Sequence, residues 1–200
     1  MQTATQVREI PVEWATPENV APFGEILGAG PAGQGRASAF YEGAVRTFSP
    51  VNFISDEDTE LVVSAVDRRQ LSVRFLERHY KHTQTFIPLD GKPVLVVVAP
   101  PNDGDEPDLD QVRALLFDGS VGFVMKLGTW HEFPFALVDR TNVVVILRHE
   151  TTRSLLPDQK IAGEAHGPDI DKLDIVERTG VTIVPKLAAA DRARVFTPRR

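Results

Sequence analysis

Glu77 and His79 stand two positions apart at the end of an otherwise apolar strand segment, LSVRFLERH. Side chains on a strand alternate between its two faces, so both residues should point the same way as the side chains at positions 71, 73 and 75. Burying a carboxylate or an imidazole costs several kcal/mol unless the group is paired or binds a ligand. The segment therefore predicts a site inside the fold at which a carboxylate and an imidazole act together.

A second strand, which follows after a short turn, carries a polar and an aromatic candidate. Gln84 and Phe86 should share one face of this strand, by the same alternation. The Asp-Gly dipeptide at residues 90–91 is typical of the turn of a β-hairpin. We therefore expect Gln84 to lie beside Glu77 and His79 at the mouth of one pocket.

The spacing of these residues resembles the first sequence motif of the cupins, in which two ligands one residue apart precede a Glu and a Gly closes the hairpin. Glu77 and His79 would be the ligand pair, and Gln84 stands in place of the Glu. The later segment KLGTWH resembles the second cupin motif, because Gly128 stands three residues before His131. If a metal ion is bound, the resemblance implies that Glu77, His79, Gln84 and His131 hold it. Such ligands suit Mn²⁺, Ni²⁺, Fe²⁺ or Zn²⁺.

Longer segments resemble the ureidoglycolate lyase family, also called ureidoglycolate hydrolase. They are VAPFGEIL, LERHYKHTQTFIPLDGKPVLVVVAP, DLDQVRALLF and GTWHEFPFALVDR, collinear from Ile10 to Arg148. The resemblance implies a cupin-like β-barrel (a double-stranded β-helix), a homodimer, and cleavage of a C–N bond in a small ureido-hydroxy acid to glyoxylate and urea, in allantoin degradation and purine metabolism. Such a reaction needs a base for the hydroxyl, an acid for the departing nitrogen and a cation for the carboxylate.

The resemblance and this chemistry together assign roles to individual residues. The predicted catalytic residues are His79, His131 and Lys126. The side chains expected to bind the substrate are Glu77, Gln84, Phe86 and Trp130. The two histidines could act as acid–base groups or as metal ligands, and both interpretations stay open. Lys126 would hold the substrate carboxylate, and Gln84 would hydrogen-bond the ureido group.

Simpler roles compete with several of these assignments. Glu77 could form a buried ion pair with an arginine such as Arg113. Strict alternation along its strand directs Lys126 outward, unless a bulge intervenes. Trp130 is of a type that commonly packs in a core, and His82 falls in a turn where solvent is expected.

The chain departs from the family pattern at three places near the expected pocket. The family usually has Tyr-His where this chain has Met125 and Lys126, and a second His where it has Glu132. Residues 147–151 replace an Asp-Arg-Gly type of stretch. These departures leave two alternatives open: a cupin-type protein that binds a small carboxylate, and an enzyme of the same fold that acts on a different keto, hydroxy or sugar acid.

Composition excludes several other classes of function. The 200 residues carry a net charge of −6, which argues against a nucleic-acid partner. There is no cysteine, so disulfides and thiol catalysis are excluded. No apolar run approaches the ~18 residues of a membrane span, and the first residues do not resemble a signal peptide. We therefore expect a cytoplasmic protein without a membrane partner.

The elements that must position the candidate residues are mostly strands. Short strands at regular spacing, separated by Gly and Pro turns, predict a mainly β fold with a few short helices. The apolar run at residues 94–99 should be a central strand, and residues 108–119 read as a helix with a capping box. We expect a cupin-like barrel domain over residues 1–150. Residues 151–200 should form a C-terminal extension, a loop plus a strand pair, that packs on the same domain.

Overall fold

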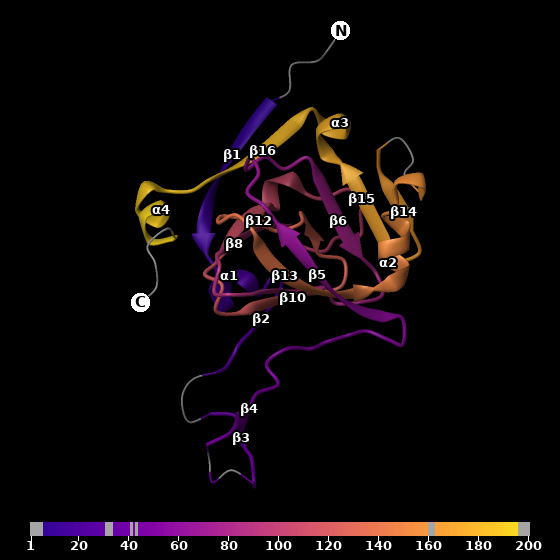
Figure 1. Ribbon diagram of the computed structural model, residues 1–200. Coiled ribbons are helices and arrows are strands. Elements are labelled where there is room, and N and C mark those ends of the chain that lie inside the picture. Colours follow the sequence, from indigo (N-terminus) through magenta and orange to yellow (C-terminus); the bar gives the residue numbers. More distant parts are fainter. Residues whose placement is uncertain (1–5, 31–33, 41, 43, 160–162, 196–200) are drawn as a thin grey trace.

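The computed structural model describes residues 6–30, 34–40, 42, 44–159 and 163–195 (Figure 1). The first five residues of the predicted barrel domain (1–5) and the last five of the predicted C-terminal extension (196–200) lie outside this set. Strands form most of the regular structure in the described part, so the predicted mainly β fold is confirmed.

Two sheets make up the body of the molecule. The larger sheet has the strand order β14 (Ala165–Gly167), β15 (Ile170–Asp174), β6 (Phe75–His79), β11 (Trp130–His131), β8 (Val94–Ala99), β9 (Arg113–Phe117), β1 (Gln6–Trp14) and β16 (Val181–Lys186), and β12 (Phe135–Ala136) pairs with β8. The smaller sheet has the order β2 (Gly24–Leu27), β10 (Gly122–Met125), β7 (Thr85–Pro88), β13 (Thr141–Arg148) and β5 (Thr59–Val66).

Short elements connect and flank the sheets. The strands β3 (Arg36–Ala37) and β4 (Arg46–Thr47) form a separate ribbon. The helices are α1 (Pro17–Val20), α2 (His149–Ser154), α3 (Ile175–Thr179) and α4 (Ala189–Val195), with 3₁₀ turns η1 (Leu109–Gln111) and η2 (Pro157–Gln159). None of the helices in the described residues is long and apolar enough to cross a membrane.

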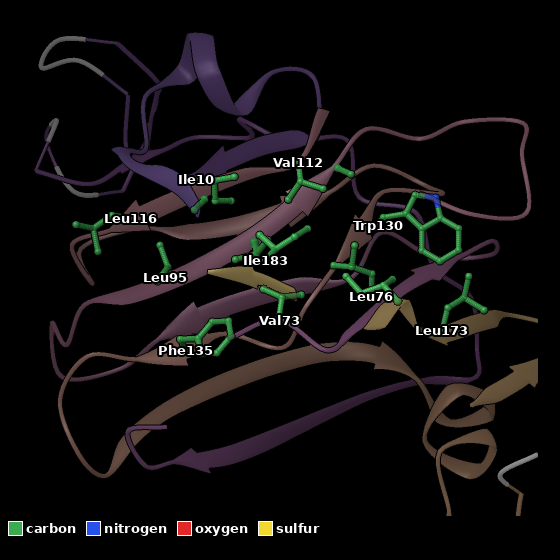
Figure 2. Close-up of a cluster of buried hydrophobic side chains, with 14 of the residues drawn as sticks. Ile10, Val73, Leu76, Leu95, Val112, Leu116, Trp130, Phe135, Leu173 and Ile183 are labelled. Carbon is green, nitrogen blue, oxygen red and sulfur yellow. The ribbon is translucent and has the colours of Figure 1, made fainter. Parts of the chain in front are cut away.

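Strand β8 lies at the centre of the larger sheet, as its apolar run predicts, and every one of its residues is buried. Val94, Val96 and Val98 pack with side chains of the smaller sheet. Leu95 and Val97 belong to a second cluster on the opposite face, part of which is drawn in Figure 2. A strand that is buried on both faces needs apolar residues at every position rather than at alternate ones.

The predicted helix at residues 108–119 is wrong beyond its first turn. Asp108 does cap η1, and its carboxylate accepts hydrogen bonds from Asp110 N and from the Gln111 side chain. The chain then enters β9, which pairs with β8 on one side and β1 on the other. Leu115 and Leu116 face opposite cores. A helix there would bury one apolar stripe, whereas the strand buries both sides.

The Asp-Gly turn forms, but it does not close a hairpin. Asp90 and Gly91 both have positive φ, 60° and 62°, as a tight reversal of this kind requires. The strands on its two sides belong to different sheets, because β7 pairs with β10 and β13 while β8 pairs with β9, β11 and β12. The turn therefore carries the chain from one sheet to the other.

The expected alternation along the key segment holds only from Phe75 onward. β6 begins at Phe75, and Val73 before it makes an isolated bridge with Ile183. Val73 and Leu76 consequently pack in the same cluster, as Figure 2 shows. Phe75 to His79 then alternate regularly, which places Glu77 and His79 on the face opposite Leu76.

The chain beyond residue 163 completes the larger sheet at both ends. β14 and β15 form a hairpin whose second strand pairs with β6, and β16 pairs in parallel with β1. Figure 1 shows the yellow β16 running alongside the indigo β1. The sequence suggested one strand pair in this segment, whereas β15 and β16 add to opposite ends of the sheet.

Candidate metal-binding and catalytic site

Three neighbouring strands place charged and imidazole side chains in one row. On β6, Glu77 lies directly opposite His131 of β11 on one side and Lys172 of β15 on the other. Directly opposite residues of antiparallel strands have Cβ atoms about 5 Å apart on the same face. His79 follows Glu77 on this face, and Gln84 approaches from the start of β7. Sheet register thus builds the site from segments far apart in the sequence.

Glu77, His79, Gln84 and His131 meet as one buried group, which we call the four-residue cluster. Gln84 Oε1 lies 2.6 Å from His131 Nε2 and 3.2 Å from His79 Nε2. Glu77 Oε1 lies 3.4 Å from His131 Nε2 and 3.9 Å from His79 Nε2. Between 1% and 4% of each residue's surface is exposed. The structure therefore brings together all four residues that the cupin-like spacing singled out.

The other ring nitrogen of each histidine faces a backbone carbonyl. His79 Nδ1 lies 3.3 Å from Asp169 O, and His131 Nδ1 lies 3.0 Å from Thr129 O. A carbonyl only accepts hydrogen bonds, so each Nδ1 carries a proton. In the neutral form that metal binding requires, each imidazole then has an Nε2 lone pair directed at the oxygens of Gln84 and Glu77. This arrangement is characteristic of histidines that bind a metal through Nε2.

Four lone-pair donors that converge without a proton between them fit a divalent cation. Glu77, His79 and His131 each offer a ligand atom within 4.8 Å of the other two. Reversal of the Gln84 amide would give the imidazoles N–H donors, but it would leave the Glu77 oxygen facing them. A cation satisfies all four groups at once, and mixed nitrogen and oxygen ligands suit the first-row divalent metals.

Lys172 holds the second carboxylate oxygen of Glu77. Its Nζ donates to Glu77 Oε2 at 2.7 Å. Burial alone would raise the pKa of the Glu77 carboxyl, but the charge of Lys172 holds that pKa well below its usual range. Glu77 is therefore ionised, with one oxygen fixed by Lys172 and the other free for the four-residue cluster. The buried ion pair expected as an alternative role does form, with a lysine instead of an arginine.

Burial, followed by the neighbouring His131, lowers the pKa of His79 from 6.5 to about 3. The unfolded chain then binds this proton more readily than the folded chain. The contribution of neutral His79 to the free energy of unfolding is therefore fully present above pH 6.5. This contribution is lost as the pH falls toward 3. We expect the free energy of unfolding of chelator-treated protein to fall by about 1.4 kcal/mol per pH unit through this one group.

Urea unfolding of the native chain and of His79→Gln at a series of pH values measures this slope. The variant should show a slope between pH 6 and pH 4 that is smaller by one proton. Above pH 7 the difference in stability between the two proteins should be constant, which serves as the internal control. Parallel curves at all pH values would contradict a neutral, buried His79.

His82 was expected to be solvated in its turn, and the structure shows that it is buried, with 1% of its surface exposed. Its Nδ1 lies 2.8 Å from Asp169 Oδ2, and its ring centroid lies 4.6 Å from that of His79. Burial alone would raise the pKa of Asp169, but the hydrogen bond from His82, with others, lowers it to about 2. Thr151, within the third departure from the family pattern, also donates to Asp169 Oδ2. Asp169 lies 87 residues after His82, so no local motif could reveal the pair.

The other predicted site residues lie around the cluster or away from it. Phe86 is buried, and its ring centroid lies 5.9 Å from that of His131, so it packs against the site. Trp130 lies in the opposite core with Leu76, as Figure 2 shows, and its indole donates to Asn102 Oδ1 at 3.2 Å. Lys126 is exposed, and its ammonium donates to the carbonyl of Ala21. The outward direction predicted for Lys126 by strand alternation thus describes its actual position.

Glu132, which stands where the family usually has a second histidine, is held away from the imidazoles. Its carboxylate lies 3.2 Å from Arg69 Nη2 and accepts a hydrogen bond from Phe75 N. Burial raises the pKa of Glu132, and the charges of Lys172 and Arg69 partly offset that rise. The glutamate at position 132 therefore forms an ion pair at the edge of the row of site residues, where the family usually has a further histidine.

The chain is similar to known proteins of one family. A family model described as ureidoglycolate lyase matches residues 7–162. The ureidoglycolate lyase of Azotobacter vinelandii is 34% identical over 71% of this chain and 86% of its own length. Those of Pseudomonas paraeruginosa and Pseudomonas putida are 32% and 34% identical, both over 71% of this chain and over 85% and 86% of their own lengths. Among solved structures, RmlC from Streptococcus suis in complex with dTDP-D-xylose matches 67% of this chain and 62% of its own, with 12% identity and a TM-score of 0.28. The chain belongs to the ureidoglycolate lyase family.

Proposed function

We propose that this protein is a ureidoglycolate lyase and that the four-residue cluster is its active site. Family membership supports the proposed lyase reaction, and one structural observation supports the proposed location of the active site. The ligand atoms of the four-residue cluster face one another inside the fold, and they belong to Glu77, His79, Gln84 and His131. Burying such groups without a function would be costly. Perturbed, buried ionisable groups of this kind are common at active sites.

The proposed reaction moves one proton and breaks one bond. The bond between the carbinol carbon and the ureido nitrogen breaks, and its electron pair goes to the nitrogen. The hydroxyl loses its proton as the carbon–oxygen double bond forms, and the nitrogen gains one proton. Glyoxylate and urea together contain all the atoms of ureidoglycolate, so the reaction needs neither water nor a redox partner.

The cluster residues have distinct tasks in this proposal. Glu77, His79, Gln84 and His131 would hold a divalent cation, which when bound polarises a substrate oxygen and lowers the pKa of a bound hydroxyl. The Nδ1–H bonds of the two histidines fix the orientation of their rings. Lys172 keeps Glu77 ionised. Lys126 has no role in the proposed chemistry, because its side chain is exposed and its ammonium donates to Ala21 rather than to a residue of the cluster.

The products released from ureidoglycolate test the proposed function. Purified protein should convert racemic ureidoglycolate to glyoxylate and urea in equal amounts, with no ammonia. Release of ammonia in place of urea would mean that the ureido group is hydrolysed. Absence of turnover with every divalent metal offered, together with binding of small carboxylic acids, would favour the carboxylate-binding alternative.

The homodimer that the family resemblance implies and the expected cytoplasmic location belong to the same proposal. Light scattering of the purified protein should give a mass twice the 22.1 kDa of one chain. A mass of one chain at micromolar concentration would contradict the dimer without affecting the proposed reaction.

A further inference from the structure

A substrate that carries a carboxylate needs a cation near the cluster, and the sequence offered Lys126 for this task. That ammonium is directed at Ala21 and is exposed. Lys172 is different, since its ammonium touches a cluster residue directly, 2.7 Å from Glu77 Oε2. Lys172 also lies beyond residues 7–162, the part of the chain that the family model matches. Family membership therefore assigns it no role.

The Lys172 side chain is partly exposed, and its ammonium has donors to spare. Its side chain is 24% exposed, whereas that of Glu77 is 3% exposed. An ammonium carries three N–H donors, and within the described part of the chain Glu77 is the one residue to which it donates. The remaining donors are available to a ligand that lies against the Lys172 side of the cluster.

Lys172 is held firmly in this position. It lies in the middle of β15, which pairs with β6 from Phe75 to His79. Its neighbour Leu173 packs in the core with Leu76, and β15 continues into α3, whose Ile175 is buried in the same cluster. A side chain on a rigid strand binds a ligand with less loss of conformational entropy than one on a loop.

We propose that Lys172 binds the carboxylate of the substrate and so makes the site selective for small carboxylic acids over their neutral analogues. A carboxylate placed there would lie beside Glu77, next to the histidine side of the cluster. The C-terminal segment would then supply a part of the binding site that the matched segment lacks. This inference rests on the proposed function for the identity of the site, and it names one residue that sets its specificity.

Binding of glycolate and of glycolamide to the metal-loaded protein, measured by calorimetry, tests the proposal. The two ligands differ in charge but little in size. In Lys172→Gln, whose amide can still donate to Glu77, glycolate should bind about 30-fold more weakly, since a charge-assisted hydrogen bond is lost. Glycolamide affinity should change by less than about twofold. Lys172→Arg should keep the preference for glycolate.

Lys186→Gln is the matched control, because Lys186 also pairs with a glutamate on a strand, Glu9, but at the far end of the larger sheet. It should bind both ligands as the native chain does. In the native chain, the ¹⁵Nζ signal of Lys172 should shift on addition of glycolate and not of glycolamide, a result that needs no folded variant.

Equal weakening of both ligands in Lys172→Gln, or an unmoved ¹⁵Nζ signal on saturation with glycolate, would overturn the proposal. Turnover of ureidoglycolate by the native chain in the same preparation would show that the proposed function stands while this inference fails. A native chain that neither turns over ureidoglycolate nor binds glycolate would overturn both.

Discussion

Replacing His131 with alanine is expected to lower kcat/KM for ureidoglycolate by about 10³-fold, the loss typical of removing a group that acts directly in the chemistry. His131 Nε2 lies nearer than any other imidazole nitrogen of the cluster to both Gln84 Oε1, at 2.6 Å, and Glu77 Oε1, at 3.4 Å. Its loss should also lower the bound metal per chain, which atomic emission measures on the same sample. Glyoxylate release gives the rate.

His149→Ala is the control for this variant. His149 has a side chain that is 51% exposed and contacts Glu60 on the surface. The control should retain the native rate and the native metal content. If His131→Ala kept more than about a tenth of the native rate, the four-residue cluster would not be the active site.

Replacing Glu77 with methionine is expected to lower the free energy of unfolding by about 3 kcal/mol, because breaking a buried ion pair leaves the other charge without its partner. This is the low end of the range for such pairs, since the Lys172 side chain is 24% exposed and solvent screens its charge. Methionine is close to glutamate in size, so a cavity contributes little. Urea unfolding measures the change, and the variant should also lose lyase activity.

Asp139→Asn is the matched control for the ion pair. Asp139 pairs with Arg68 at 2.8 Å, but both side chains are more than half exposed. Exposed pairs of this kind contribute about 0–1 kcal/mol. Equal destabilisation by the two substitutions would contradict the account of Glu77 as a buried charge that depends on Lys172.

The part of the site that sequence predicts well is the part built by short-range geometry. Glu77 and His79 share a face because they are two residues apart on one strand, and Gln84 follows after one turn. His131 was found through the spacing of a second motif. Lys172 could not be found in this way, because it meets Glu77 through the register of β15 on β6, 95 residues along the chain. Asp169 meets His82 through the turn before the same strand.

The fold shows the same division between local and long-range determinants. The apolar run of β8 was readable, since its continuous apolar pattern reflects burial on both faces of the strand. The segment that becomes β9 has apolar residues that suit either a helix stripe or a strand buried on both faces. The segment forms a strand because β8 and β1 pair with it on either side. The sequence of the segment does not reveal these two pairing partners.

We propose that the four-residue cluster binds a divalent metal and cleaves ureidoglycolate with it. The most direct test strips the protein with a chelator, restores Mn²⁺ or Ni²⁺ in measured amounts, and follows glyoxylate release against metal bound per chain. We predict that the rate falls with the metal, returns in proportion to it, and levels off at one equivalent per chain, while His131→Ala recovers little activity. A metal-free protein that retains the full rate would contradict this claim and would assign His79 and His131 to acid–base catalysis instead.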